Sequence, residues 1–304
     1  MKIQKMCDDL NSLIHDKFFL NIYLCKKLND YERTFTSLDL IGDCQNAIEE
    51  FDSIPIGSFQ SRTTLYIYGV LQSLYCQQDG LYHLYKTINS QNIKLNDFFK
   101  LYDFNKEIRE VRDDIAGHPT DRKSGKEFYY IVKGSNSKYS FSYAGYNPDF
   151  KNVDVDLKAF ILEQSVFTAK VLNDIKKAIS EKIQVHKNRF NKMKLISIIA
   201  NINLPTKQIM RGIFEDYPFS MKGLNDVVIE LVSLKQKLNL RYGDKIPESI
   251  KNIFRLQDHI LEKMKKWISN NELTNNVDAE IFMDSFDSQM KMLSEILKEI
   301  DDEF

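Results

Sequence analysis

Apolar residues in the first 190 positions recur at steps of three and four, the spacing that places side chains on one face of a helix. This pattern predicts helices over about residues 3–28, 37–51, 58–88, 96–117 and 154–183. Asn96 suits the cap position of the fourth helix. Gly117 is expected to end that helix, because glycine commonly ends helices and the residue before Pro119 is pushed toward extended backbone.

Residues 126–144 break the helical period. Two runs rich in aromatic and β-branched residues, 128–132 and 139–143, flank a polar turn at 134–137, and the second run alternates strictly between large and small side chains. The pattern predicts a single β-hairpin over about residues 126–144. Because an isolated hairpin is marginally stable in water, this one is expected to pack on a helical surface.

Helical spacing returns beyond a charged stretch at 182–194. It predicts four further helices, over about residues 206–216, 221–241, 248–270 and 275–303. A boundary is expected near residue 192, which gives a helical domain over 1–192 and a C-terminal helical domain over 193–304. The predicted fold class is all-α, a helical bundle with an inserted β-hairpin followed by a second helical domain.

The 304 residues carry a formal net charge of −1, which argues against long contact with duplex nucleic acid and allows only a local basic site. The longest apolar run, 195–200, is far shorter than the roughly 20 residues that span a bilayer. Asp8 and Asp9 precede any sustained apolar stretch, so no secretory signal is expected. We therefore expect a soluble cytoplasmic protein with no membrane partner.

The four cysteines, Cys7, Cys25, Cys44 and Cys76, are far apart in the sequence. They show neither the spacing of zinc ligands nor that of a redox pair, so we interpret them as small core residues. The chain also contains no glycine-rich phosphate-binding loop. These observations predict no metal site and no cofactor.

The segment most typical of a chemical site is residues 112–119, at the predicted end of the fourth helix. Arg112 and His118 are separated there by five residues. On an unbroken helix, six steps of about 100° would rotate His118 roughly 240° away from Arg112, so the chain must turn at Gly117 for the two side chains to meet. A guanidinium binds phosphate oxygens and an imidazole exchanges protons, and metal-independent RNA cleavage requires both capacities.

An arginine, a polar residue directly after it and a histidine at this distance, set at a helix end, resemble the HEPN family of all-helical proteins. The resemblance extends over roughly residues 36–185 and does not cover the C-terminal third. It implies that Arg112, Asp113 and His118 are catalytic and that the chain is a metal-independent endoribonuclease. It also implies attack by the 2′-hydroxyl, a 2′,3′-cyclic phosphate product, and a homodimer whose two motifs face one cleft.

Three further cations, Arg109, Arg122 and Lys123, are candidates for contact with RNA phosphates, since the planar guanidinium of arginine is well suited to that task. For Arg109 the alternative is an ion pair with Asp113, one turn further along the helix. Asp113 either orients the histidine or pairs with Lys106 or Arg109 on the helix surface.

Two main hypotheses about function follow. The first is an endoribonuclease of the toxin or anti-phage defence type, with RNA as substrate, a homodimeric assembly, and an antitoxin or regulatory protein as a further partner. The alternative is a non-catalytic HEPN-like helical protein that acts by binding or dimerisation, in which Gly117 and His118 only end a helix. An Arg112 locked in an internal salt bridge would favour that alternative. A third hypothesis is a nucleotide-binding partner of a nucleotidyltransferase.

Overall fold

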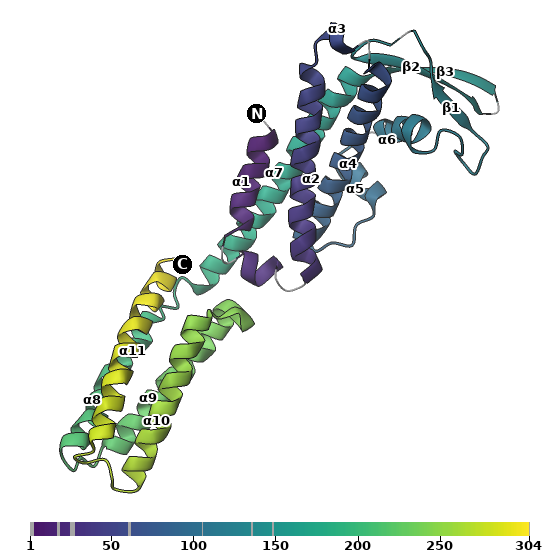
Figure 1. Ribbon diagram of the computed structural model, residues 1–304. Coiled ribbons are helices and arrows are strands. Elements are labelled where there is room, and N and C mark those ends of the chain that lie inside the picture. The colour runs from purple at the N-terminus through teal and green to yellow at the C-terminus, as the bar shows by residue number, and fades with distance from the viewer. Residues whose placement is uncertain are drawn as a thin grey trace. The chain divides into compact units, whose positions relative to one another are not determined.

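The computed structural model describes residues 3–16, 19–24, 28–59, 62–104, 106–134, 136–147 and 149–303, and most of them are helical (Figure 1). The chain divides into two compact units, Met1–Glu181 and Lys182–Phe304. The division falls inside helix α7 (Leu157–Phe190), upstream of the boundary predicted near residue 192. No helix in the described part of the chain has the length and apolar character needed to cross a membrane.

The first unit contains three long helices, and α2 and α4 pack closely along each other (Figure 1). Gly80 permits this approach, because a Cβ atom at that position would lie 2.9 Å from Cγ1 of Ile41 on the facing helix. In chain order the helical elements are α1 (Ile3–Ile14), the π-helical turn η1 (Phe19–Leu24), α2 (Leu28–Ser53), α3 (Ile56–Phe59), α4 (Thr63–Asn89), α5 (Leu95–Leu101), α6 (Glu107–Arg112), the π-helical turn η3 (Asp113–Gly117), and α7.

A network of buried side chains crosses the interior of this bundle. Gln77 of α4 donates to Gln45 of α2 at 3.2 Å and accepts hydrogen bonds from Gln164 and Thr168 of α7 at 2.9 and 3.1 Å. Gln78 of α4 donates in turn to the carbonyl oxygen of Gln164 at 3.0 Å. A buried polar group left without a partner costs about 1–3 kcal/mol, so these amides hold α2, α4 and α7 in one alignment.

The predicted fourth helix is two helices, α5 and α6, with a break between them. Asp103 has a φ of +51°, a left-handed conformation that an α-helix does not continue. Directly after this residue the ring of Phe104 stacks on Phe167 of α7, with ring centroids 4.1 Å apart. Asn96 lies inside α5 instead of capping it, because that helix begins one residue earlier.

The predicted first helix is also shorter than expected. It ends at Ile14, and the carboxylate of Asp16 then accepts the backbone N–H of Phe19 at 3.1 Å, where η1 begins. The first backbone N–H groups of a helix lack an intrahelical acceptor, and an aspartate cap supplies one. The cap at Asp16 therefore favours the start of a new helical segment over continuation of α1. The predicted helical positions Phe18 and Cys25 lie outside the described residues.

The predicted hairpin is a three-stranded antiparallel sheet, in the order β1 (Phe128–Ile131), β2 (Ser140–Asn147) and β3 (Asp149–Asp156). The sequence interpretation placed the start of a helix near Asp154, but the alternation of Val153 and Val155 with polar residues continues as a strand. Asp156 then accepts the backbone N–H groups of Lys158 and Ala159 at 2.9 and 3.0 Å. This cap fixes the start of α7 directly after the strand.

One face of the sheet packs on the first unit, as expected for a small sheet attached to helices. Phe141, Tyr143 and Val155 on that face are buried. Near the start of β2, the ammonium of Lys138 donates to the backbone carbonyls of Asp52, in the last turn of α2, and of Ile54, directly after that helix. The ammonium thus meets carbonyl oxygens that the end of a helix leaves without an intrahelical donor.

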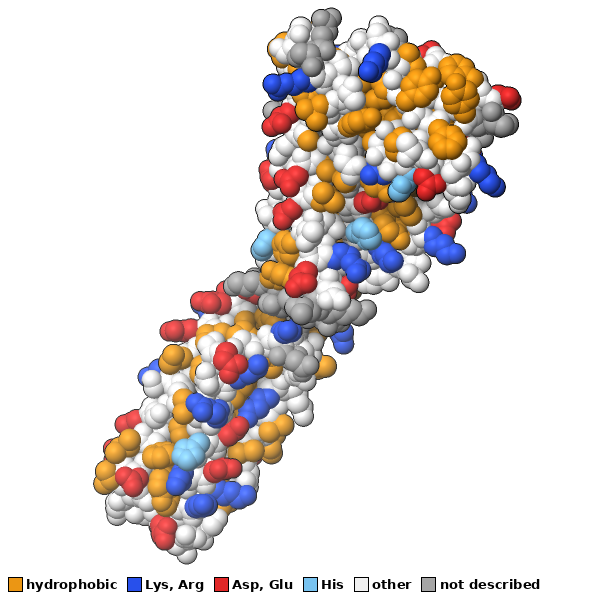
Figure 2. Space-filling model, turned by 45° about the vertical axis from the view of Figure 1, so that its right-hand side comes forward, with side chains coloured by type: hydrophobic (Ala, Val, Ile, Leu, Met, Phe, Trp, Pro, Cys, Tyr) orange, Lys and Arg blue, Asp and Glu red, His pale blue; other side chains and the backbone are white. Residues whose placement is uncertain are grey.

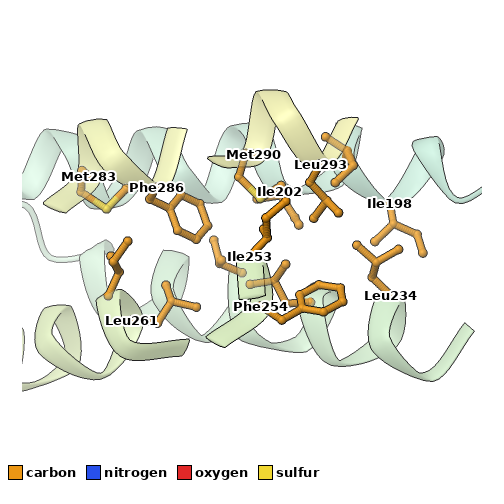
Figure 3. Close-up of a cluster of buried hydrophobic side chains, with 14 of the residues drawn as sticks. Ile198, Ile202, Leu234, Ile253, Phe254, Leu261, Met283, Phe286, Met290 and Leu293 are labelled. Atoms are coloured by element: carbon orange, nitrogen blue, oxygen red, sulfur yellow. The ribbon is translucent and has the colours of Figure 1, made fainter. Parts of the chain in front are cut away.

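The second unit, Lys182–Phe304, contains four long helices around a continuous apolar core (Figure 3). Figure 3 shows apolar side chains of all four, such as Ile202, Leu234, Phe254 and Phe286, directed into the space between the helices. The bounds, which include a short 3₁₀ turn, are α8 (Ile196–Phe214), α9 (Ser220–Tyr242), η4 (Gly243–Lys245), α10 (Glu248–Ser269) and α11 (Val277–Asp302).

The helices α9, α10 and α11 agree closely with the predicted ranges, but α8 begins at Ile196, well before the predicted start near residue 206, and contains Pro205 in its interior. The sequence interpretation let the helix begin after that proline. Buried Ile198, Ile199 and Ile202 lie on the N-terminal side of Pro205. Burial of these side chains contributes more than the proline disrupts, since each buried aliphatic side chain contributes about 1.5–3 kcal/mol.

A buried ion pair lies at one end of the second unit. Nη1 of Arg241 is 3.0 Å from Oδ1 of Asp301, and the Arg241 side chain is fully buried. Arg241 also donates to the backbone carbonyl of Met193, while Oδ2 of Asp301 accepts the backbone N–H of Ile196 at 2.9 Å. The pair therefore ties the end of α9, the end of α11 and the segment before α8 together.

Candidate functional site

The chain turns at the end of α6 by widening into the π-helical turn η3. The backbone N–H of His118 donates to the carbonyl of Asp113 at 2.9 Å, a bond that spans five residues instead of four. The turn ends at Gly117, as the sequence predicted. A Cβ atom on Gly117 would lie 2.8 Å from Nη1 of Arg112, so the turn folds back against the guanidinium. Successive Cα atoms are about 3.8 Å apart, so the Cα atom of His118 lies within roughly 8 Å of Nη1 of Arg112.

Arg112 is held by residues of α4, forty positions earlier in the chain. Oε1 of Gln72 accepts from Nε at 2.9 Å and from Nη2 at 2.8 Å, and Oδ1 of Asp113 accepts from Nη1 at 2.8 Å. The guanidinium carbon lies 4.3 Å from the centre of the Tyr75 ring. A guanidinium has five N–H donors, so one N–H on each terminal nitrogen has no hydrogen-bond acceptor among the described residues. The side chain keeps 19% of its surface exposed.

His118 is exposed, in contrast to the guanidinium beside it. Among the residues that the structure describes, no side chain or backbone group makes a hydrogen bond to its ring, and Asp113 is bonded to Arg112 instead. The ring is accordingly open to solvent or to a bound molecule. An imidazole in this position can accept or donate a proton without first breaking an internal bond.

Asp113 does not pair with Lys106 or Arg109, which corrects one sequence interpretation. Its other carboxylate oxygen lies 3.9 Å from Nη1 of Arg122. Asp113, the first residue of the π-helical turn, thus lies between Arg112 and Arg122.

Arg122 is bound by a second carboxylate, that of Asp114. Its Nε lies 2.7 Å from Oδ1 of Asp114, and the hydroxyl of Tyr143 on β2 donates to Oδ2 at 3.1 Å. Burial raises the pKa of Asp114, while the charge of Arg122 and the hydrogen bonds from Arg122 and Tyr143 act in the opposite direction. The same carboxylate raises the pKa of Tyr143, for which burial is the larger cause. Asp114, which belongs to the turn, therefore links Arg122 to Tyr143 of the sheet.

The two remaining predicted RNA-binding cations are also in ion pairs. Arg109 lies 2.9 Å from Asp79 of α4, and its guanidinium carbon is 3.8 Å from the centre of the Tyr75 ring. Lys123 pairs with Glu127, and this hydrogen bond is the largest cause that lowers the pKa of Glu127. The turn and α6 thus bring three arginines together, and each is paired with a carboxylate: Arg109 with Asp79, Arg112 with Asp113, and Arg122 with Asp114. Lys123 keeps most of its side chain exposed.

The sequence interpretation missed the contribution of α4. Gln72, Tyr75 and Asp79 are spaced three and four residues apart, which places them on one helical face, and all three contact an arginine of α6. The spacing of these polar and aromatic side chains does predict that they share one face of a helix. It does not indicate which distant segment of the chain packs against that face.

Comparison with family models, with curated proteins and with solved structures gives no significant match to this chain. Any statement about its chemistry therefore depends on the geometry of the turn and on the residues that hold it. In the part of the chain that the structure describes, no group of three or more His, Cys, Asp and Glu side chains is arranged to hold a metal ion.

Proposed function

We propose that the chain is a HEPN-type endoribonuclease whose active site contains Arg112 and His118. The observation that carries the proposal is a guanidinium with two uncommitted N–H donors, whose Nη1 lies within roughly 8 Å of the Cα atom of the exposed His118. Gln72 and Asp113 fix the guanidinium before any substrate binds. A preorganised cation stabilises the charge that develops on phosphoryl oxygens with little reorganisation during the reaction.

In the proposed reaction a bond forms between the 2′-oxygen and phosphorus while the bond from phosphorus to the 5′-oxygen breaks. Neutral His118 removes the proton of the 2′-hydroxyl, or protonated His118 gives a proton to the leaving 5′-oxygen, and Arg112 binds the non-bridging oxygens. The products are a 2′,3′-cyclic phosphate and a 5′-hydroxyl. Gln72 and Asp113 are positioning residues, because they contact Arg112.

One imidazole cannot perform both proton transfers in the same step, so a second copy of the chain completes the site. A two-fold homodimer would supply a second His118 and a second Arg112 to the same phosphate. Light scattering should give the mass of a dimer, and mixing an Arg112→Ala chain with wild-type chain should lower activity below the simple average. A fully active monomer at all dilutions would contradict the composite site.

A nuclease of this type without regulation would act as a toxin or anti-phage effector. An antitoxin or regulatory protein that controls its activity is therefore the further partner that fits the proposal.

The direct test is to incubate the purified full chain with total RNA in EDTA and to identify the new ends. Wild type should cleave and leave 2′,3′-cyclic phosphates, and His118→Ala should lose this activity with an unchanged melting temperature, since the side chain is exposed. His259, an exposed histidine of α10, provides the matched control, and His259→Ala should cleave as wild type does. Cleavage by His118→Ala at the wild-type rate would remove the histidine from the mechanism.

The second candidate is a non-catalytic HEPN-like helical protein that acts by binding or dimerisation. The observation that favours it is the internal ion pair of Arg112 with Asp113, together with the carboxylates that neutralise Arg109 and Arg122. In that case wild type should leave total RNA intact at any concentration. Arg112→Ala would then lower stability without any change in activity, which separates the two candidates.

A further inference from the structure

The outer face of the sheet carries a row of exposed aromatic rings. Phe128 of β1 is the register partner of Tyr146 of β2, and Tyr146 is the register partner of Phe150 of β3. Paired residues of adjacent antiparallel strands point to the same face, so the three rings cross the whole sheet in one line. Tyr130 lies two residues along β1 and joins them on that face. These four residues form what we call the ring face, and their exposed fractions are 47%, 53%, 56% and 51% in the order named.

Two of the rings are in contact, and a small residue lies beside a third. The centroids of Tyr146 and Phe150 are 5.6 Å apart, and the small residue Ala144, the register partner of Tyr130, is buried beneath its neighbours. Figure 2 shows ring-shaped hydrophobic side chains gathered on the part of the first unit that carries the sheet. Exposed aromatic residues gathered in this way mark a binding surface, because scattered single ones are the norm on other surfaces.

The size of the ring face argues against another protein as its main occupant. Four aromatic side chains of about 200 Å² each, half exposed, offer roughly 400 Å². A stable protein interface needs about 800 Å² from each partner. The bases of single-stranded nucleic acid, by contrast, stack on successive aromatic rings, and a sheet with aromatic side chains on one face is a recurrent platform for this contact.

One end of the ring face lies near the candidate active site. The backbone N–H of Tyr129, the residue after Phe128, donates to the carbonyl of Pro119, the residue after His118, at 2.8 Å. With standard bond lengths, the Cα atoms of Phe128 and His118 are therefore no more than roughly 11 Å apart. A nucleic-acid strand with a base stacked on Phe128 could therefore place its backbone at His118 over a short distance.

The charges of the sheet indicate the direction in which a bound nucleic-acid strand would cross it. Asp154 and Asp156 lie toward the far end of β3, opposite Ser142 and Ser140, and would repel phosphates there. Phe150 lies at the opposite end of β3, which begins at Asp149. A nucleic-acid strand is thus expected to run across the three strands along the rings instead of along β3.

We infer that the ring face binds single-stranded RNA by base stacking and leads it to Arg112 and His118. The inference names the substrate class of the proposed nuclease and rests on that function. Double-stranded RNA is excluded from this contact, because its bases are already stacked on each other and do not present their faces. The nuclease should accordingly cut single-stranded regions and spare duplexes.

The test measures binding separately from cleavage. Fluorescence anisotropy with the full chain would use a labelled ten-nucleotide oligoadenosine carrying 2′-O-methyl groups, which has no 2′-hydroxyl to attack. Wild type should bind this probe and should bind the same sequence in duplex form at least tenfold more weakly. Phe128→Ala with Phe150→Ala should weaken single-strand binding by about tenfold or more, the effect expected from losing one or two stacked bases.

Two matched variants sharpen the result. Phe219→Ala removes a half-exposed ring from the second unit and should bind as wild type does. Arg112→Ala should bind the probe within about threefold of wild type while losing cleavage, since stacking and not a single phosphate contact supplies most of the affinity. Circular dichroism and light scattering on each variant would confirm the fold and the oligomeric state.

The outcomes distinguish RNA binding by the ring face from the proposed nuclease activity. No binding by wild type, or unchanged binding by the double ring variant, would overturn the ring face as an RNA site and leave the nuclease proposal standing if cleavage persists. Conversion of a dimer to a monomer by the ring substitutions would show that a second copy covers the face, which also overturns it. Ring-dependent binding without any cleavage would support the ring face and contradict the nuclease.

Discussion

Each unit of this protein contains a histidine, an arginine and an aspartate near one another, and the two sets differ in burial. In the second unit Arg241 is fully buried against Asp301 and also donates to backbone carbonyls. In the first unit Arg112 is held by Gln72 and Asp113, yet two N–H donors and part of its surface remain available to a ligand. The guanidinium of Arg241 therefore has a structural role, whereas that of Arg112 is available to bind a ligand.

The two histidines show the same contrast. His186 of α7 is buried, and burial, followed by the nearby charges of Arg189 and Arg241, lowers its pKa to about 4. His118 is exposed at the end of a turn. A residue type and its neighbours in sequence do not distinguish these cases, because what differs is the access of solvent and ligand to the side chain.

The largest expected effect of a single substitution is on the buried pair. Arg241→Leu leaves Asp301 charged and buried without its partner, and breaking such a pair costs about 3–5 kcal/mol. Chemical denaturation should show this loss in the transition that reports on the second unit, which Trp267 fluorescence follows. Arg255→Leu on the exposed face of α10 is the control and should change stability by no more than about 0.5 kcal/mol. An Arg241→Leu protein as stable as wild type would remove the contrast with Arg112.

For Arg112 the prediction is reversed, with a large effect on activity and a small one on stability. Arg112→Ala should lower RNA cleavage by about 10²–10³-fold, the usual effect of removing one preorganised donor to a developing negative charge. Its hydrogen bonds to Gln72 and Asp113 are partly exposed, so the free energy of unfolding should fall by only about 1–2 kcal/mol. A loss of stability without cleavage in wild type would assign Arg112 to structure, as Arg241 is.

The buried histidine predicts a pH dependence in the second unit. Because the folded-state pKa of His186 is about 4 and its ordinary value is 6.5, the unfolded chain takes up the proton first as the pH falls. Stability is therefore complete above about pH 6.5 and is lost between there and about pH 4, by at most about 3 kcal/mol. His186→Phe should abolish this part of the pH dependence in urea titrations followed by Trp267. An unchanged pH profile in that variant would show that other groups are responsible.

Much of the fold was accessible from the sequence because apolar period and helix breakers agree. The helices α9, α10 and α11 begin and end near the predicted positions, where polar loops with Pro218 or Pro247 separate them. The break at Asp103 was not predictable, because a left-handed conformation is uncommon even for aspartate, which is enriched there relative to most other residues. The strand β3 was missed because its short apolar run fits a helix start as well as a strand end.

The candidate site was predictable only in part. The position of the turn at Gly117 follows from local rules, and the structure confirms it. The partners of Arg109, Arg112 and Arg122 do not follow, because Asp79 and Gln72 come from α4 and the wide turn redirects Asp113. Local sequence rules describe contacts within a few residues, whereas tertiary packing decided which carboxylate each arginine meets.

The smallest predicted effect tests whether the exact placement of the guanidinium matters. In Gly117→Ala the new Cβ would lie 2.8 Å from Nη1 of Arg112 and 3.1 Å from Oδ1 of Asp113, so both side chains must shift by a few tenths of an ångström. The position is not one of positive φ, and a smaller unfolded-state entropy favours alanine by about 0.4–1 kcal/mol, which offsets much of the crowding. Stability should therefore change little, while cleavage falls by about tenfold because a misplaced catalytic group is costly. Gly57→Ala, where no atom lies within 4 Å of the new Cβ, should leave cleavage unchanged. Full activity in Gly117→Ala would mean that the position of the Arg112 guanidinium is not important for the reaction, and the contrast between the two arginines would then rest on burial alone.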